Sequence, residues 1–332
     1  MELQREVEAL VKQTQDRSGW PIRRTLKVLE IPPASYYRWR RGRGRTREAV
    51  QSFFELLPAE REAIVHYALK HPEVRHRELA WKMVDDGVCA VSPSSVYRVL
   101  TGADLVSGWK PKVKAKGTGK PVPPKRPDEL WQTDIRYVKV GSRNYYLLSF
   151  LDVYSRYVVH HELLRCMDGL SVSIAAAAAL ATLPDGRRPV IQSDHGSGFI
   201  AGEFAGTLAG AGVTHTLIRP HTPTDNAFIE RYHRTIGEKI DEHELEDYAQ
   251  ACAVIDGIID HYNHRRLHSS LKYLRPVDYY RGNPEALLAE RRRKLKTARE
   301  QRKQENIKLR QRLIPWAGSE IVPYAKRRSV SL

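Results

Sequence analysis

Three acidic residues, Asp134, Asp194 and Glu230, are the part of this 332-residue chain whose types and spacing could do chemistry. Asp134 lies in the apolar-framed run 131–138, Asp194 closes the short strand-like run 189–194, and 35 residues separate Asp194 from Glu230. Mg²⁺ takes octahedral oxygen ligands and is held by one or two carboxylates together with substrate phosphates. Two such ions about 3.5 to 4 Å apart can clamp the attacking and leaving oxygens of a phosphoryl displacement. A chain with 39 acidic residues offers many carboxylate triples, so the prediction depends on the surrounding sequence.

The net charge of +16 is distributed unevenly along the chain. Residues 1–127 carry a net charge of +11, residues 128–281 carry −4, and residues 282–332 carry +9. The three carboxylates therefore lie in a slightly acidic middle region between two basic arms. Basic arms suit the phosphates of DNA or RNA, because neutralising phosphates releases counterions and supplies most of the sequence-independent affinity. For either arm alone, membrane binding or simple solubility is the alternative.

The cysteines and the apolar runs bear on the compartment. Cys89, Cys166 and Cys252 lack the spacing of a disulfide framework or a zinc ribbon, which favours a reducing compartment. The charged segment 1–15 does not have the pattern of a signal peptide, and the longest bland stretch, 174–181, is too short to span a bilayer. We therefore expect a soluble intracellular protein without a membrane partner.

The first basic arm is expected to hold a helical DNA-binding unit in residues 1–48. Apolar residues recur at helical spacing over 3–11 and again over 22–29, and Pro32-Pro33 precedes a short third helix at 34–40. The pattern is that of a helix-turn-helix, whose last helix enters the major groove; a generic helical hairpin is the alternative. The expected DNA contacts of this unit are Tyr37, Arg38, Arg40, Arg41 and Arg43.

A second helix-turn-helix-like unit is expected in residues 56–108. Helix-like segments cover 60–70, 75–86 and 92–100, and Ser92-Pro93 has the signature of a helix start. Ser95 and Arg98 are the expected DNA contacts on the last of these helices. Residues 109–127 then form a linker rich in Lys, Gly and Pro, in which Lys112, Lys114 and Lys116 are expected to meet the DNA backbone.

The middle region, residues 128–281, changes from a helical period to a mixed one. Three antiparallel strands followed by alternating helix and strand is the order of a ribonuclease-H-like α/β fold. A basic helical tail, residues 282–332, is expected to follow this core. The expected strands are 131–140, 144–151, 153–163, 190–193 and 213–218, and the expected helices are 171–182 with Ser171 as its cap, 202–211, 226–240 with Glu230, 246–264 and 285–312.

Four motifs occur in one order across this core: WQTD at 131–134, LDVYSR at 151–156, SDHGS at 193–197 and PTDNAFIE at 223–230. With the closing pattern around Tyr262-Asn263, they resemble the catalytic domain of DDE transposases of the retroviral-integrase superfamily. The match is specifically to transposases of bacterial insertion sequences of the IS-three type, and it covers about residues 125–280. The first helical region resembles the start of these transposases less specifically.

The resemblance implies a DNA transposase that binds insertion-sequence ends, frees their 3′-hydroxyls and joins them to DNA. It implies that Asp134, Asp194 and Glu230 are catalytic and hold two Mg²⁺ ions per active site, with Mn²⁺ as a substitute. It further implies a homo-oligomer, a dimer or larger, acting on double-stranded DNA in the bacterial cytoplasm in association with the nucleoid. The alternatives are a metal-dependent nuclease that does not join DNA, and a DNA-binding regulator with a decayed core.

One position departs from the family pattern. The family usually has Lys or Arg seven residues after the glutamate, on the same helix face, but here that residue is Gly237. His233 and Arg234, three and four residues after Glu230, lie on the correct face, and both are expected to contact DNA, Arg234 at the end of the DNA. Lys239 falls near the opposite face.

Three further polar residues beside the motifs have two readings each. His195 is expected either to contact a phosphate or to stabilise the turn that follows Asp194. Asn226 is expected to cap or orient the Glu230 helix, with a contact to the DNA end as the alternative. Asp152 is expected to be structural, paired with an arginine such as Arg156, with a metal-binding role as the alternative.

Overall fold

The computed structural model contains all 332 residues and describes residues 2–40, 52–106, 124–184, 186–219 and 226–313. The chain forms two compact units, one of Met1–Leu56 with Glu300–Leu332 and one of Leu57–Arg299. No helix in the described part of the chain is long and apolar enough to cross a membrane.

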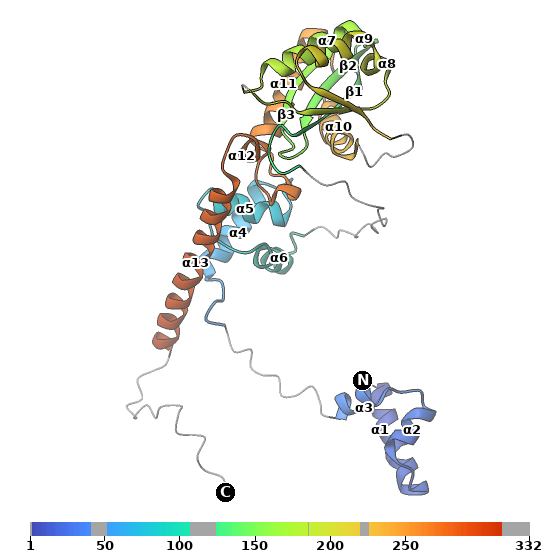
Figure 1. Ribbon diagram of the computed structural model, residues 1–332. Coiled ribbons are helices and arrows are strands. Elements are labelled where there is room, and N and C mark those ends of the chain that lie inside the picture. The colour runs from blue at the N-terminus through green and yellow to red at the C-terminus, as the bar shows by residue number, and fades with distance from the viewer. Residues whose placement is uncertain (1, 41–51, 107–123, 185, 220–225, 314–332) are drawn as a thin grey trace. The chain divides into compact units, whose positions relative to one another are not determined.

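The first unit contains the three expected N-terminal helices. They are α1 (Glu2–Ser18), α2 (Ile22–Val28) and α3 (Pro33–Arg40), as Figure 1 shows. Their contacting faces bury Val7, Val11, Leu26 and Tyr36 in a small core, so the helical spacing of the apolar residues correctly predicted a packed helical unit.

The second unit begins with the other helical set, α4 (Pro58–Lys70), α5 (His76–Asp85) and α6 (Pro93–Gly102). The hydroxyl of Ser92 accepts a hydrogen bond from the amide of Ser95 at 3.2 Å, which caps α6 as the sequence predicted. Ile64, Leu79, Met83 and Val96 are fully buried between the three helices. The three predicted helices of this region are confirmed.

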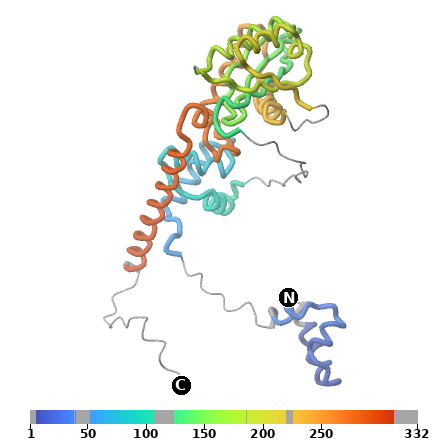
Figure 2. Tube along the Cα trace, viewed as in Figure 1, coloured from blue at the N-terminus to red at the C-terminus, as the bar shows by residue number. Residues whose placement is uncertain are grey.

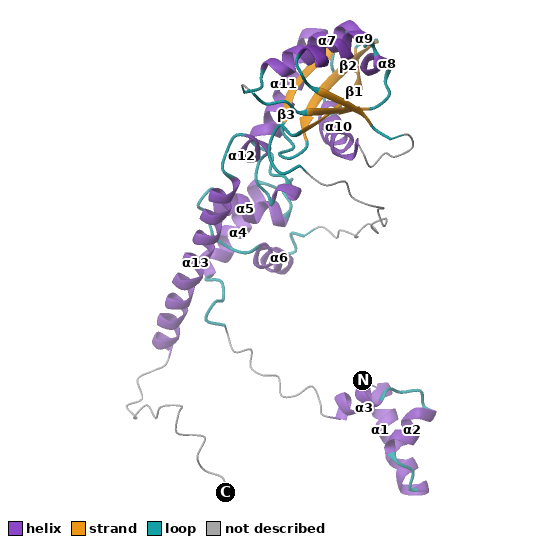
Figure 3. Cartoon of the chain, viewed as in Figure 1, coloured by secondary structure: helices purple, strands orange, loops and turns teal. Residues whose placement is uncertain are grey.

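The core is a five-stranded mixed sheet in the order β3-β2-β1-β4-β5. Strands β1 and β2 pair antiparallel, as do β2 and β3, whereas β1 with β4 and β4 with β5 pair parallel. Figure 3 shows these strands in orange between purple helices. The predicted α/β fold of the ribonuclease-H type is confirmed. The strands are β1 (Leu130–Val140), β2 (Arg143–Asp152), β3 (Val158–Leu164), β4 (Val190–Ser193) and β5 (Thr214–Leu217).

Helices cover both faces of the sheet. Successive residues of a strand point to opposite faces, and the central strands carry apolar side chains on both. One cluster includes Trp131 and Phe150 with residues of α7 (Gly169–Ala181), α8 (Ser197–Ile200) and α9 (Gly202–Gly210). The opposite cluster includes Leu147 and Leu151 with residues of α10 (Ala227–Ile240) and α11 (Tyr248–His264). A 3₁₀ turn (Ser269–Leu271), α12 (Pro276–Tyr280) and the long α13 (Pro284–Leu313) complete the described fold.

Two predicted element boundaries are wrong, each because a carboxylate organises the local backbone. The carboxylate of Asp152 accepts hydrogen bonds from the amide and hydroxyl of Ser155, which turns the chain so that β3 begins at Val158 instead of 153. Helix α7 is capped by Asp168, which accepts from the amide of Ser171 at 2.9 Å, so Ser171 is not the cap.

Asp152 is fully buried and structural, but the hydrogen bonds that hold it do not come from an arginine. Besides Ser155, the amide of Asp128 donates to its carboxylate at 2.9 Å. The guanidinium of Arg156 lies 3.6 Å from the ring centroid of Phe228, at the start of α10. Burial raises the pKa of Asp152 to about 6 in spite of these hydrogen bonds.

Arg291 of α13 joins three parts of the second unit, and Figure 2 shows the red α13 beside the α5 region. Its side chain is only 4% exposed, and its guanidinium donates from Nε at 2.8 Å and from Nη2 at 2.5 Å to the Asp85 carboxylate of α5. It also donates to the carbonyl oxygens of Lys272 and Tyr273, at 3.1 and 2.8 Å. A buried arginine is tolerated when its donors are satisfied in this way.

His268, just after α11, is half-buried near three arginines, which predicts a pH-dependent stability. Burial, aided by Arg156, Arg266 and Arg231, lowers the pKa of His268 to about 4. An unfolded histidine has a pKa of about 6.5. Because the folded state disfavours the charged form, its contribution to stability is complete above pH 6.5 and is lost as the pH falls toward 4.

We therefore expect the free energy of unfolding to fall by about 2 kcal/mol more between pH 7 and pH 4.5 in the wild type than in His268→Gln. Urea unfolding at both pH values measures this difference. His243→Gln, at an exposed histidine, is the matched control. Identical pH dependence in wild type and His268→Gln would contradict the prediction.

Candidate active site

Strands β1 and β4 direct two of the three carboxylates to one edge of the sheet. The last pair of their parallel register joins Gln132 to Gln192, and β4 ends at Ser193. Asp134 and Asp194 each follow that pair by two residues, so both lie toward the same edge of the sheet. Both aspartates are half-buried. They therefore form one acidic edge where β4 ends and β1 continues.

The side chain of Gln132 connects this edge to α10. It is buried on the same strand face as Asp134, two residues before it. Its Nε2 donates to Gln192 Oε1 at 3.0 Å, and its Oε1 accepts from the amide of Ile229 at 3.2 Å. Ile229 directly precedes Glu230. The side-chain amide of Gln132 therefore holds the first turn of α10 beside β1 and β4. Glu230 lies in this turn.

Helix α10 makes a second contact to the edge, one turn further on. His233 is buried, and its Nδ1 donates to Asp134 Oδ2 at 3.2 Å, while Asp134 Oδ1 accepts from the amide of Ile135. Asp194 Oδ1 accepts from the amide of Gly196 at 2.9 Å. A Cβ on Gly196 would lie 3.0 Å from the same oxygen, so glycine permits this close approach. Both aspartates are thus oriented by hydrogen bonds.

The oxygen donors of the site suit a hard divalent cation, although they are not preassembled around one. Glu230 is exposed, and neither it nor Asp194 has an ion pair with a described residue. Within the described residues, no three His, Cys, Asp or Glu side chains are grouped closely enough to hold a metal ion. Carboxylate oxygens whose negative charge is not neutralised by a nearby Lys or Arg are the ligands that Mg²⁺ or Mn²⁺ prefers.

Four residues near the site were expected to contact DNA, and they differ in exposure. Arg234 is exposed on α10, one turn after Glu230, and His195 is exposed directly after Asp194. His233, by contrast, is buried against Asp134. Asn226 occupies the N-cap position of α10, but its side chain makes no capping hydrogen bond, and its buried Oδ1 has no partner among the described residues.

The expected contacts in the arms are described only in part. Tyr37 is exposed on α3. Arg98 is exposed on α6, and its guanidinium donates to Ser95 Oγ at 3.4 Å and to the carbonyl of Ser94 at 3.3 Å. The side chains of Arg38 and Arg40 are not described, and Arg41, Arg43, Lys112, Lys114 and Lys116 lie outside the described residues.

Arg136 is a cation of this region that the motifs do not point to. It follows Asp134 by two residues and so lies on the same face of β1. Its Nη1 donates to the carbonyl of His233 at 3.3 Å, and its Nη2 lies 3.6 Å from a carboxylate oxygen of Asp241. Two features of the sequence could have identified Arg136. It is two residues after Asp134, and Gly237 stands where the resembling family has a basic residue.

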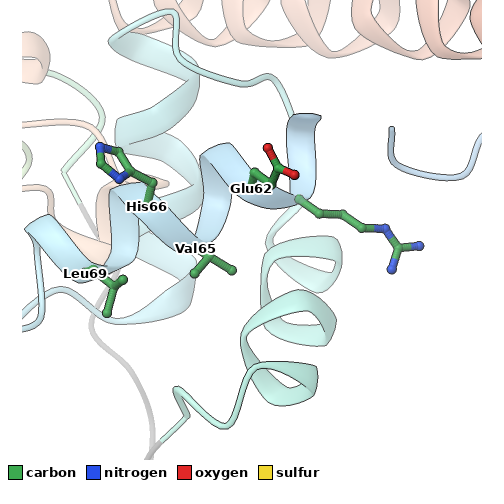
Figure 4. Close-up of a pocket in the computed structure, with 5 residues that line it drawn as sticks. Glu62, Val65, His66 and Leu69 are labelled. Carbon is green, nitrogen blue, oxygen red and sulfur yellow. The ribbon is translucent and has the colours of Figure 1, made fainter. Parts of the chain in front are cut away.

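A shallow hollow on α4 contains none of the three carboxylates. Figure 4 shows the residues that line it, which are Arg61, Glu62, Val65, His66 and Leu69. It is open to solvent on the surface of one helix, and the acidic edge of β1 and β4 remains the candidate active site.

Two family models described as integrase core domain match residues 124–223 and 211–276. The chain is 28% identical over 159 residues to the "Transposase for insertion sequence element IS904" of Lactococcus lactis, covering 47% of this chain and 63% of that protein. It is 27% identical over 157 residues to the "Putative transposase InsK for insertion sequence element IS150" of Escherichia coli, covering 46% and 55%. The chain thus spans less than two thirds of these relatives. A solved HTLV-2 integrase catalytic core in complex with magnesium matches with a TM-score of 0.38 at 16% identity, covering 47% of this chain and 97% of that one.

Proposed function

We propose that this chain cuts and joins insertion-sequence DNA. The premise is that residues 124–276 make it a member of the integrase superfamily of DDE transposases. The chain would free the 3′-hydroxyls of the element's ends and join them to target DNA. The observation that carries the proposal is the acidic edge of Asp134 and Asp194, with the first turn of α10 and its Glu230 held beside it through Gln132.

Asp134, Asp194 and Glu230 are proposed to hold divalent ions, two Mg²⁺ per site with Mn²⁺ as a substitute. When bound, such ions activate an attacking oxygen and offset the charge that develops on the phosphate. The chain's own residues keep the ligands in position. Gln132 holds the start of α10 against β1, and His233 orients the Asp134 carboxylate by its hydrogen bond.

The helical units are proposed to bind double-stranded DNA. Helix α6 presents Arg98 and Tyr97 to solvent at the end of a three-helix unit, which is the arrangement of a recognition helix. The net charges of +11 on residues 1–127 and +9 on residues 282–332 supply sequence-independent affinity. We further propose a homo-oligomer, a dimer or larger, on DNA in the bacterial cytoplasm, because the two ends of an element must be held together.

A strand-transfer assay tests the proposal. The purified chain is incubated with pre-cleaved DNA fragments from the ends of its own element, a supercoiled plasmid and Mg²⁺. We expect plasmid joined to the fragments with Mg²⁺ or Mn²⁺, and none with a chelator. Cutting without joined product would instead support a metal-dependent nuclease. DNA binding without cutting or joining would support a regulator with a decayed core.

A further inference from the structure

Gly237 lies in the middle of α10, where glycine is among the least favourable residues, so its presence calls for a packing reason. The reason is Arg136. A Cβ on Gly237 would lie 2.3 Å from Cζ of Arg136 and 2.4 Å from both Nη atoms. The guanidinium of β1 therefore occupies the place where a side chain of residue 237 would begin. No residue larger than glycine fits at 237 while Arg136 lies there.

Two matching rows of residues lead to this point. On β1, Gln132, Asp134 and Arg136 share one face. On α10, the partners of these residues are Ile229, His233 and Gly237, and their spacing of four positions keeps them in one stripe. Gln132 bonds the amide before Glu230, Asp134 bonds His233, and Arg136 lies on Gly237. Arg136 is thus the next residue after Asp134 in the row on β1, and the Cα atoms of these two residues are about 7 Å apart along the strand.

The protein engages the Arg136 guanidinium only weakly. Its hydrogen bond to the carbonyl of His233 is long, at 3.3 Å, and the Asp241 oxygen lies 3.6 Å away in an exposed carboxylate. Exposed ion pairs of this kind contribute little. The buried Nε has no hydrogen-bond partner among the described residues. A guanidinium presents a fork of donors that matches a phosphate, and apart from the Nη1 bond to His233 the terminal N–H groups of Arg136 make no hydrogen bond with a described residue, so these groups can bind an anion.

We infer that Arg136 binds a backbone phosphate of the DNA strand that enters the active site past Asp134. In this role it supplies from β1 the positive charge that α10 lacks at Gly237. The inference rests on the proposed function. A purely structural role, in which Arg136 only joins β1 to Asp241 at the C-cap of α10, is the competing explanation. It predicts that returning a cation at 237 does not restore activity.

The test moves the charge from the strand to the helix. Arg136→Ala removes the cation, and Arg136→Ala with Gly237→Lys returns one from the position that the arginine vacates. Lys239→Ala is the matched control, because it removes the same charge from an exposed residue of α10 that is paired with Glu242. Each protein is measured for thermal unfolding, for binding to end DNA between about 50 and 200 mM salt, and for strand transfer.

We expect Arg136→Ala to lower strand transfer at least tenfold and to reduce the slope of log K against log salt by about 0.9, the value for one phosphate contact. The double variant should recover the slope and most of the strand transfer. Lys239→Ala should match the wild type.

Normal strand transfer and slope in Arg136→Ala would overturn the inference, as would a folded double variant no better than Arg136→Ala. A wild type that binds end DNA but does not join it would refute the proposed function instead, and the salt slopes would still test the phosphate contact.

Discussion

Replacing Glu230 by glutamine is expected to reduce cutting and joining by about a thousandfold or more while binding of end DNA stays within twofold of the wild type. Loss of a single donor that stabilises a transition state already costs about 10² to 10³ in rate, and loss of the proposed metal ligand Glu230 should cost at least as much. Glutamine keeps the shape of the side chain but removes its charge. Glu230 is exposed, so the fold should be little affected.

The two activities are measured with radiolabelled end fragments, and binding is measured by gel shift in Ca²⁺ to prevent turnover. Glu238→Gln is the matched control, since it makes the same change at another exposed glutamate of α10. Wild-type cutting by Glu230→Gln would remove Glu230 from the catalytic residues. Equal inactivity of Glu238→Gln would show that the loss comes from the helix and not from the carboxylate.

Replacing Arg291 by methionine is expected to lower the free energy of unfolding of the Leu57–Arg299 unit by about 3 kcal/mol. Breaking a buried ion pair costs about 3 to 5 kcal/mol, because it leaves the other charge without a partner. The Asp85 side chain is 40% exposed and can be rehydrated, which places the effect at the low end. The carbonyls of Lys272 and Tyr273 lose their donors as well.

Urea unfolding followed by tryptophan fluorescence measures this loss, since the ring of Trp81 lies 5.1 Å from the guanidinium. Arg293→Met is the control, because Arg293 is exposed and its one ion pair with a described residue is to Glu290, three residues before it. That change should stay within about 0.5 kcal/mol of the wild type. A midpoint for Arg291→Met equal to that of Arg293→Met would mean that the contacts of Arg291 do not stabilise this unit.

The parts of the fold that follow from local sequence were predictable. The strand-like runs around the Gly141-Ser142 turn predicted β1 and β2, and the helical spacing over 3–11 and 22–29 predicted the N-terminal helices, because such local patterns report which face of an element is buried. Asp134 and Asp194 could be singled out because each occurs in a strand-like run. Local sequence does not distinguish Asp168 from Ser171 as the cap of α7, since both are good capping residues.

The parts that depend on contacts between distant residues were not predictable. Asp85 and Arg291 are 206 positions apart, and Gln132 meets Ile229 across 97 positions. Each contact exists only once the elements that carry it have packed. Arg136 illustrates the limit, because its importance follows from the absence of a side chain at Gly237, on a helix that the chain reaches about a hundred residues later.

The overlap between Arg136 and any side chain at position 237 also restricts how this protein can evolve. A lysine introduced at 237 first would have to displace the guanidinium of Arg136, and loss of the arginine first would leave the stripe without its cation. The effect of a change at either position is therefore expected to depend on the residue at the other. Among descendants of this sequence, changes at 136 and 237 should become fixed together.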